Sequence, residues 1–482
     1  MNKGNPEYIS DFWNLYKTLL PAEADAFSQF VDSGLFNRKK PVVHLLKICK
    51  KQFAEKGSAK KEQLYAEAFD GKKYNGQVLK NYFTHLKKLL LQFMQLQWMQ
   101  QKISVQQWAV AEMYLQKGLV NQFQKLSKKY VEDKKPVYSP DEIFIQLKLQ
   151  SLSDEYLSTT ATKRRFDLLE ACVFNFREYY FLDTMRMYCE LINRRNLKGI
   201  EFNKKELQSF LQYFHENKSE YNLHPLLQIY FYVFGFLKNS DDEEAYMQYK
   251  KILIEYVGQM PVRTARELCL YGQNQCVKHI NLNHHKYLSE LFDLYNIMLL
   301  NNIMYEGQYM SQWTFKNYIT VALRLKEFYK AENFIETYKH KILPDVQHDA
   351  YHYNLASLYF EKNDFDAAMV ALNKIHSNDA VYYLDGRSIL LKIYFEKEDF
   401  ETLASLYHSV RVYLLRNKKL SRKQGDLYRY LFLYTYRLSR LIDKRPFIDT
   451  ENYAVAKNKL HEKILNTDIA NKNWLTGKLN VP

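Results

Sequence analysis

A seven-residue segment occurs twice in the C-terminal half of the chain. Tyr359 to Phe365 reads YFEKNDF and Tyr394 to Phe400 reads YFEKEDF, so six of seven residues are identical at a spacing of 35. A period so close to 34 residues indicates helix-turn-helix units, each of which must bury its apolar face against its neighbours. This feature predicts a stack of paired helices.

Glycine and proline are both scarce, with 14 and 10 residues in a chain of 482. These counts are about half or less of the average usage of roughly 7% and 5%. Few sharp turns are available, which favours long helices. From Ser139 onward, amphipathic stretches follow one another, and Ser139, Pro140 and Glu142 form a helix start with an N-cap serine, a proline at the first position and a capping-box glutamate. The sequence predicts an all-α fold.

The sequence lacks the signals of membrane proteins and of the common enzyme classes. Its longest strongly apolar run, Ile229 to Leu237, is far shorter than the roughly 20 residues that cross a bilayer. The first residues lack the apolar segment of a signal peptide. No Gly-x-Gly-x-x-Gly, P-loop or Gly-x-Ser-x-Gly motif occurs. We therefore expect a cytoplasmic protein that is not an enzyme and has neither a cofactor nor a membrane partner, and its five dispersed cysteines agree with a reducing compartment.

Two histidines spaced four residues apart are the best candidate for a metal site. His348 and His352 can share a helix face, with Asp345 and Asp349 nearby. A zinc site needs a third ligand, and no glutamate follows His348 as a hydrolytic zinc motif requires. We interpret these histidines as packing or solvent-facing residues and predict no metal. A second group falls short of a paired Cys-x-x-Cys arrangement and is expected to be structural: Cys269, Cys276 and His279.

The positive charge of the chain is concentrated near its N-terminus. Phe36 to Leu90 contains 14 Lys and Arg against four acidic residues, which leaves +10 of the chain's net +15. The excess is therefore a local property of one module. Apolar spacing predicts three helices in it, over Pro41 to Lys56, over Ala59 to Phe69, and from Gln77 past Leu90.

The third of these helices has an apolar side and a polar side. A helix of this kind can enter the major groove of DNA with its polar side, while flanking lysines contact phosphates. The alternative is a lysine-rich module that binds an acidic partner protein or only faces solvent. The candidate base-contacting residues are Lys80, Asn81, Thr84 and Lys87, and the candidate phosphate-contacting residues are Lys72, Lys73 and Lys88.

The repeated segment and its surroundings resemble the tetratricopeptide family. Leu355, Ala356 and Tyr359 stand where the first helix of that family has its leucine, small residue and aromatic residue, and Ala368 stands where the second helix needs a small residue. In the second copy, leucines replace both alanines. The resemblance implies repeat packing by these residues and by the aromatic residues Phe365, Tyr394 and Phe400.

Leu79 to Leu90 resembles the third helix of the winged-helix domain in bacterial transcriptional activators of the streptomycete antibiotic regulatory type. Lys60 to Phe69 is similar to the second helix of that domain. In that family a tetratricopeptide-like domain follows the winged helix. The resemblance implies DNA binding, although the sequence continues as apparent helix after Leu90, where a β-hairpin wing would follow.

These observations predict an all-α chain in four segments: a basic N-terminal helical domain, winged-helix-like in form, over residues 1–135; repeat-like helical hairpins over 139–310; tetratricopeptide-like repeats over 311–465; and a loose C-terminal tail over 466–482. The segments over 139–310 and 311–465 are expected to form an α-solenoid together. The predicted function is a non-enzymatic scaffold that binds another protein. The alternative is a transcriptional regulator that binds duplex DNA through its N-terminal module and uses the solenoid as a partner or sensor domain.

Overall fold

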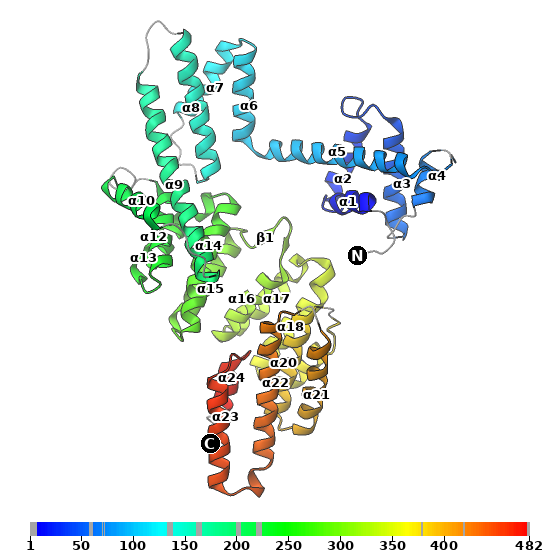
Figure 1. The fold of residues 1–482 in the computed structure, drawn as a ribbon, viewed down its shortest axis with the longest axis vertical. Coiled ribbons are helices and arrows are strands. Elements are labelled where there is room, and N and C mark those ends of the chain that lie inside the picture. The colour runs from blue at the N-terminus through cyan, green and yellow to red at the C-terminus, as the bar shows by residue number, and fades with distance from the viewer. Residues whose placement is uncertain are drawn as a thin grey trace. The chain divides into compact units, whose positions relative to one another are not determined.

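The computed structural model describes residues 7–56, 61–69, 71, 73–132, 138–160, 166–198, 204–217, 224–376, 379–417 and 420–479 (Figure 1). Within these ranges almost all regular structure is helical, and the strands found are β1 (Tyr305–Glu306) and β2 (Tyr309–Met310), which pair antiparallel. The prediction of an all-α fold is confirmed. Among the described helices, none combines the length and the apolarity needed to cross a bilayer. The chain divides into two compact units, Met1–Tyr180 and Phe181–Pro482.

The first unit begins with five helices that share one core. α1 packs against α5, and α3 contacts α2, α4 and α5. α5 begins after Asn75, whose side chain accepts hydrogen bonds from the backbone N–H groups of Gln77 and Val78, both at 3.1 Å. This cap stabilises the start of the longest helix of the core. The helices are α1 (Glu7–Tyr16), α2 (Pro21–Asp32), α3 (Lys40–Lys56), α4 (Lys61–Ala68) and α5 (Gly76–Gln101).

Three further helices of the first unit pack against one another around a second, smaller core. Ala111, Phe123 and Leu149 are its buried residues, one from each helix. The rings of Phe123 and Tyr156 meet edge to face at 5.5 Å, a favoured arrangement of aromatic pairs. The helices are α6 (Ile103–Gln116), α7 (Val120–Glu132) and α8 (Pro140–Thr160), and α9 (Phe166–Lys198) continues into the second unit.

Tyrosines form much of the core in the first part of the second unit. Tyr230, Tyr246 and Tyr249 are fully buried. The hydroxyl of Tyr249 donates a hydrogen bond to the Leu268 carbonyl at 2.8 Å, which satisfies a polar group inside an apolar core. Here α12 packs against α13 and α14, and α14 packs against α15. The helices are α10 (Lys204–Glu216), α12 (Pro225–Lys238), α13 (Glu243–Tyr256), η1 (Val257–Gln259), α14 (Val262–Asn281) and α15 (Lys286–Leu300).

Three consecutive helix pairs follow, α16 with α17, α18 with α19, and α20 with α21. The first helix of each pair also contacts the first helix of the next, from α16 through α18 and α20 to α22. Each second helix contacts the first helix of the following pair as well. Every pair thus buries apolar surface on its neighbour. The elements are α16 (Gln312–Arg324), α17 (Phe328–Tyr338), η2 (Lys339–Lys341), α18 (Pro344–Glu361), α19 (Phe365–Leu372), α20 (Ala380–Glu396), α21 (Phe400–Arg416), α22 (Arg422–Asp443), η3 (Arg445–Phe447), α23 (Thr450–Leu465) and α24 (Lys472–Leu479).

The same turn joins the two helices of each of these pairs. Lys326, Asn363 and Glu398 adopt the left-handed backbone conformation, with φ of 62°, 61° and 56°. In each turn the next residue donates its N–H to the carbonyl five residues back at 2.9 Å, an arrangement that satisfies the last carbonyls of a helix. The donor and acceptor pairs are Glu327 and Ala322, Asp364 and Tyr359, and Asp399 and Tyr394.

In both copies of the repeated segment, the aspartate after the turn also starts the second helix. Asp364 accepts a hydrogen bond from the N–H of Ala367 at 3.0 Å, and Asp399 accepts one from the N–H of Thr402 at 3.1 Å. These are N-cap contacts. The repeated sequence thus combines a helix end, a turn and a helix start.

The residues predicted to pack within the repeats are buried or half-buried. Ala356 and Ala368 have no exposed surface, and Leu391 and Leu403 at the equivalent positions of the next pair are equally buried. The second pair therefore accommodates larger side chains at these positions. The half-buried members are Leu355, Tyr359, Phe365, Tyr394 and Phe400.

Part of the C-terminal segment is ordered, although we expect residues 466–482 to be loose. Residues 472–479 form α24, in which Leu475 and Leu479 are buried. Just before it, the N–H of Ala470 donates to the Leu427 carbonyl of α22 at 3.2 Å. The apolar side chains of α24 pack against the preceding helices α22 and α23.

Candidate functional site

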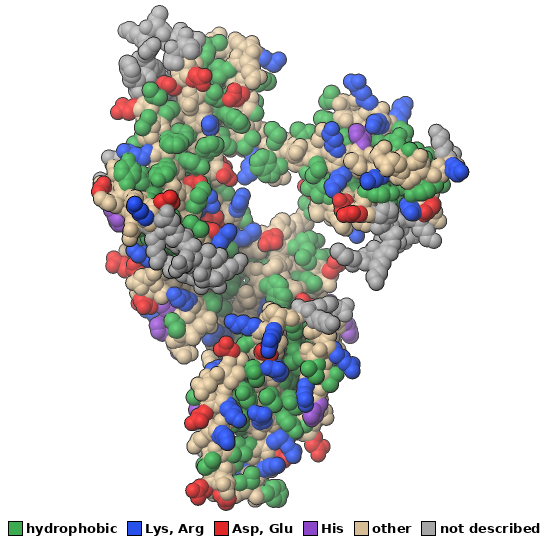
Figure 2. Space-filling model, in the orientation of Figure 1, with side chains coloured by type: hydrophobic (Ala, Val, Ile, Leu, Met, Phe, Trp, Pro, Cys, Tyr) green, Lys and Arg blue, Asp and Glu red, His purple; other side chains and the backbone are tan. Residues whose placement is uncertain are grey.

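The polar side of α5 carries most of the residues predicted to bind nucleic acid. Lys72 lies outside the described residues. In Figure 2, Lys and Arg side chains are spread over the visible face of the part formed by α1 to α5. The predicted residues that are exposed on α5 or in the turn before it are Lys73, Lys80, Asn81, Thr84 and Lys88.

Some of these groups already have partners within the protein. The Nζ atom of Lys87 lies 2.9 Å from Asp11 Oδ2 of α1. The hydroxyl of Thr84 donates to the Lys80 carbonyl at 2.9 Å, so this side chain is partly turned back on its own helix. Among the predicted residues described on α5, the lysines left for an anionic ligand are Lys80 and Lys88.

A loop that the sequence patterns do not single out adds to this surface. The Oδ1 atom of Asn37, in the loop between α2 and α3, lies 3.3 Å from His85 Nε2 of α5. Burial, and then the charges of Lys39 and Lys88, lower the pKa of His85. A loop lysine and a helix lysine therefore both lie close to one imidazole. The run Arg38 to Lys40 is the sequence signal that could have indicated this contribution.

The chain directly after α5, through residue 132, forms no β-hairpin that could serve as a wing. It passes from α5 into α6 at Lys102 and then into α7, with helix assigned on both sides of each junction. Within residues 76–132, therefore, the regular structure is the three helices α5, α6 and α7, with no strand.

The histidine pair considered as a metal site has other partners. The ring centroids of His348 and His352 lie 4.5 Å apart, and His348 Nε2 lies 2.9 Å from the Lys374 carbonyl. Asp349 accepts a hydrogen bond from the backbone N–H of His376 at 3.0 Å. Over the part of the chain that the structure describes, no group of three or more His, Cys, Asp or Glu side chains is arranged to hold a metal ion.

The second group, on α14, lies within the core. Cys276 Sγ is 3.1 Å from the hydroxyl of Tyr246, and His279 Nε2 is 2.7 Å from the Ser240 carbonyl. Burial raises the pKa of both Cys269 and Cys276 to about 12. These thiols stay protonated at neutral pH, and thiolates are the form that binds metals or acts as a nucleophile.

A nearly buried ion pair joins two first helices of the stack. Lys316 of α16 pairs with Asp385 of α20, and their side chains are 18% and 14% exposed. The other carboxylate oxygen of Asp385 accepts a hydrogen bond from the Tyr428 hydroxyl of α22 at 2.7 Å. Burial, and then the charge of Asp385, raise the pKa of Tyr428, so its hydroxyl remains a donor.

Aromatic rings surround the same ammonium group. Lys316 Nζ lies 5.7 Å from the ring centroid of Trp313, 5.0 Å from that of Tyr353 and 5.8 Å from that of Tyr382. At these distances the rings stabilise the positive charge. One feature of the sequence relates two members of this cluster. Lys316 and Tyr353 occupy equivalent positions in neighbouring first helices, each ten residues before the left-handed residue of the following turn.

The C-terminal helix α24 lies against the same surface of α20, further along the helix. Lys392 donates a hydrogen bond to Asn471 Oδ1 at 2.9 Å. Glu396 accepts one from Trp474 Nε1 at 3.2 Å and one from Lys478 Nζ at 2.6 Å. We name the surface that includes both clusters the first-helix face, and it consists of Trp313, Lys316, Tyr353, Tyr382, Asp385, Lys392, Glu396 and Tyr428.

Lys392 is the lysine of the first-helix face whose pKa departs clearly from its ordinary value. Its ammonium lies 5.5 Å from the ring centroid of Phe360 and 5.7 Å from that of Trp474. Burial lowers its pKa to about 8, against the opposing effect of Glu361, Asp385 and Glu396. The contact between α20 and α24 therefore encloses a cationic group between two aromatic rings.

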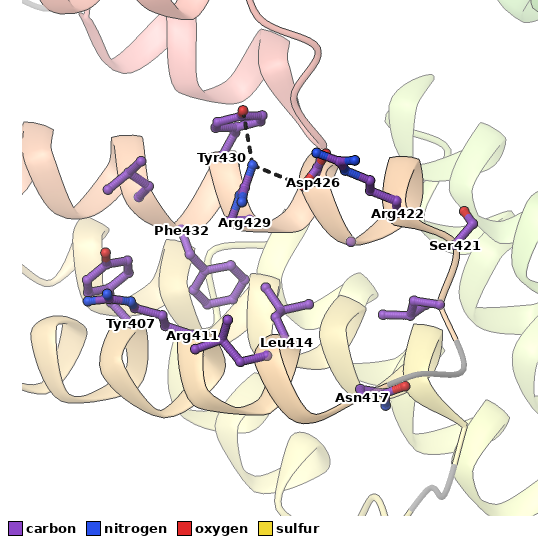
Figure 3. A pocket seen from close by; sticks show the side chains of 14 residues that line it. Tyr407, Arg411, Leu414, Asn417, Ser421, Arg422, Asp426, Arg429, Tyr430 and Phe432 are labelled. Carbon is purple, nitrogen blue, oxygen red and sulfur yellow. Dashed lines mark hydrogen bonds and ion pairs between the residues drawn. The ribbon is translucent and has the colours of Figure 1, made fainter.

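A groove of about 590 Å³ lies between α21 and α22 (Figure 3). Three arginines line it, Arg411, Arg422 and Arg429. Arg429 Nη2 lies 3.0 Å from Asp426 Oδ1 and donates a hydrogen bond to the Tyr430 hydroxyl at 3.1 Å. Asp426 is the acidic side chain among the described lining residues. The apolar lining consists of Leu414, Leu415, Leu420, Phe432 and Leu433.

No protein-family model matches this sequence, and neither a curated protein nor a solved structure matches it.

Proposed function

We propose that this protein is a non-enzymatic protein-interaction scaffold whose tetratricopeptide-like helix pairs form an α-solenoid. In this proposal, the first helices α16, α18, α20 and α22 provide the recognition surface. Their consecutive contacts and the shared turn geometry support a repeat stack. A stack of this kind presents a continuous surface to a segment of another protein.

The observation that carries the proposal is the binding of α24 to the first-helix face of α20. This helix of eight residues is held on Glu396 of α20 by the indole of Trp474 and by the ammonium of Lys478, and it also packs against α22 and α23. The first-helix face therefore already binds a short amphipathic helix of its own chain. Binding of a helical segment in a groove uses the same physical contacts, with apolar anchors and a few paired charges.

The half of the first-helix face around Asp385 has no such occupant among the described residues. Trp313, at its edge, is 40% exposed, whereas Tyr353 and Tyr382 are buried. A partly exposed aromatic side chain beside paired charges is typical of protein-binding surfaces. We assign this half to the partner segment.

A photo-crosslinking amino acid at position 313 tests the proposal. In cells of the native organism we expect it to capture one discrete protein, because Trp313 borders the assigned half. The same amino acid at Tyr329, which is 81% exposed on the second helix α17, is the matched control. Binding of the purified captured protein is then measured by titration calorimetry.

The expected result is capture from position 313 and not from position 329, followed by direct binding. Identical sets of captured proteins from both positions, or no captured protein at position 313, would contradict the proposal.

The second candidate is a DNA-binding transcriptional regulator. It is favoured by one observation, the exposure of Lys80 and Lys88 on the same side of α5 with Lys39 close by. Lysines in this arrangement can neutralise phosphates of duplex DNA.

For this candidate we expect the double substitution Lys80→Ala/Lys88→Ala to weaken binding of fluorescent duplex DNA at least about tenfold and to lower the salt slope by about two, because each phosphate contact contributes roughly one counterion. Lys87→Ala should have a smaller effect, because Asp11 already pairs with Lys87.

The control is Lys444→Ala/Lys459→Ala, which removes two exposed charges from the second unit. Binding that is absent in near-physiological salt, or equally weakened by both double variants, would reject the DNA-binding candidate.

A further inference from the structure

The stack leaves one helix position unfilled at its end. Each second helix, α17, α19 and α21, packs against its own first helix and against the next first helix. α22 is a first helix by its contacts with α20 and α21, and the helix that follows it, α23, packs against α22 and against α24, which bonds to Glu396 on the first-helix face of α20. Figure 1 shows α21 and α23 on opposite sides of α22. The place beside α21 and α22, where the pattern puts a fourth second helix, holds no described helix.

The groove between α21 and α22 is this place. Its floor is apolar, and Leu415 within it is 78% exposed, which is unusual for a leucine on the packed side of a helix stack. The groove also follows two helices, as the side views of α21 and α22 in Figure 3 make clear. Its shape and apolar lining fit a third helix better than a compact small molecule.

The charges of the groove decide what kind of helix fits. Asp426 is already paired with Arg429 at 3.0 Å. Among the described residues, neither Arg411 nor Arg422 forms an ion pair, and Asp426 and Asp468 line an adjacent hollow together with Arg422. An apolar floor bordered by two arginines that form no ion pair among the described residues complements an apolar stripe flanked by carboxylates, because arginine binds carboxylates in a bidentate manner.

We infer that the groove between α21 and α22 binds an acidic amphipathic helix of a partner protein, which completes the stack as its missing second helix. Leu414, Leu415 and Leu420 contact the apolar stripe, and Arg411 and Arg422 pair with its flanking carboxylates. This inference rests on the proposed scaffold function and adds a second binding surface, distinct from the first-helix face.

The test uses the full-length protein and three fluorescein-labelled peptides of about 18 residues, long enough to form a helix on binding. The first has leucines at helical spacing and glutamates elsewhere. The second replaces every glutamate by lysine, and the third is a scrambled sequence of the first. Fluorescence anisotropy at near-physiological salt measures the affinities.

We expect the acidic amphipathic peptide to bind at least about tenfold more tightly than the scrambled one, and the lysine peptide not to bind. The exposed double substitution Arg411→Glu/Arg422→Glu should weaken binding at least about tenfold. Leu415→Asp should weaken it independently of the arginines. The matched control is Arg437→Glu, an exposed charge reversal on α22 outside the groove lining, which should leave the affinity nearly unchanged.

Equal binding of the acidic and scrambled peptides, or equal losses in Arg437→Glu and Arg411→Glu/Arg422→Glu, would overturn the inference. Self-association that Leu415→Asp abolishes, without binding of the acidic peptide, would assign the groove to a second copy of the chain and would also overturn it. If capture from position 313 succeeds while peptide binding fails, the groove inference fails and the scaffold function stands. If capture from position 313 and peptide binding both fail, the scaffold function and the groove inference are both rejected.

Discussion

Lys316→Met is expected to lower the free energy of unfolding of the second unit by about 2–3 kcal/mol. The substitution leaves the carboxylate of Asp385 nearly buried, with the Tyr428 hydroxyl as its remaining partner of the two described above. Removing one member of a fully buried ion pair costs roughly 3–5 kcal/mol, and the residual exposure of this pair reduces the penalty. Urea denaturation of the wild type and the variant measures the difference.

A double-mutant cycle separates the ion pair from the lost packing of the lysine stem. Asp385→Asn removes the charge and keeps an acceptor for Tyr428. The double variant Lys316→Met/Asp385→Asn should therefore be more stable than Lys316→Met alone, by on the order of 1 kcal/mol.

The control pair is Lys397 and Asp366. Lys397 Nζ lies 2.6 Å from Asp366 Oδ1, and the two side chains are 40% and 82% exposed. Lys397→Met should change stability by less than about 1 kcal/mol, because exposed ion pairs contribute little. Equal losses in Lys316→Met and Lys397→Met would show that burial of the first pair does not matter.

Gly272→Ala is expected to destabilise the second unit by about 1–3 kcal/mol, the usual cost of overpacking a core. A Cβ atom at Gly272 would lie 2.5 Å from the hydroxyl oxygen of Tyr249 and 3.0 Å from Leu294 Cδ1. Tyr249 is fully buried and is fixed by its hydrogen bond to Leu268, so it cannot move aside easily. This clash outweighs the gain of roughly 1 kcal/mol that alanine brings to a helix interior.

Gly425→Ala is the matched control, since Gly425 also lies within a helix but has no atom within 4 Å of its Cβ position. Here the helix propensity acts alone and should stabilise the protein by about 0.5–1 kcal/mol. The two substitutions should thus shift the urea midpoint in opposite directions. A stabilising effect of Gly272→Ala would disprove the close packing of α13 against α14.

The local features of the fold follow from the sequence because their determinants are neighbours in the chain. The repeated Asn363-Asp364 and Glu398-Asp399 pairs encode the turn and the next helix start within a few residues. The spacing of apolar residues every three or four positions likewise predicts which side of α5 is buried. Such patterns depend on helix geometry alone.

The ion pair between Lys316 and Asp385 could not be predicted in this way, because 69 residues separate its members. Its partners come from different helix pairs, and the offset between neighbouring first helices decides which positions meet. The proximity of Lys39 to His85 depends on how the loop before α3 packs, which no periodic pattern records.

Short elements held by tertiary contacts also escape prediction. The strands β1 and β2 contain two residues each and turn at Gly307, with φ of 66°. Arg266 of α14 donates to the Ile303 carbonyl beside them at 3.1 Å. α24 has only eight residues, and tertiary contacts with α20, α22 and α23 hold it in place.

The docking of α24 also affects the order in which the stack can open. A linear array of helix pairs frays from its ends, because a terminal pair has only one neighbour. Here the end of the chain returns past α22 to α20, through Trp474, Lys478 and Asn471. Because α24 contacts both α20 and α22, we expect the last helices to open together, as a single cooperative unit closed by α24.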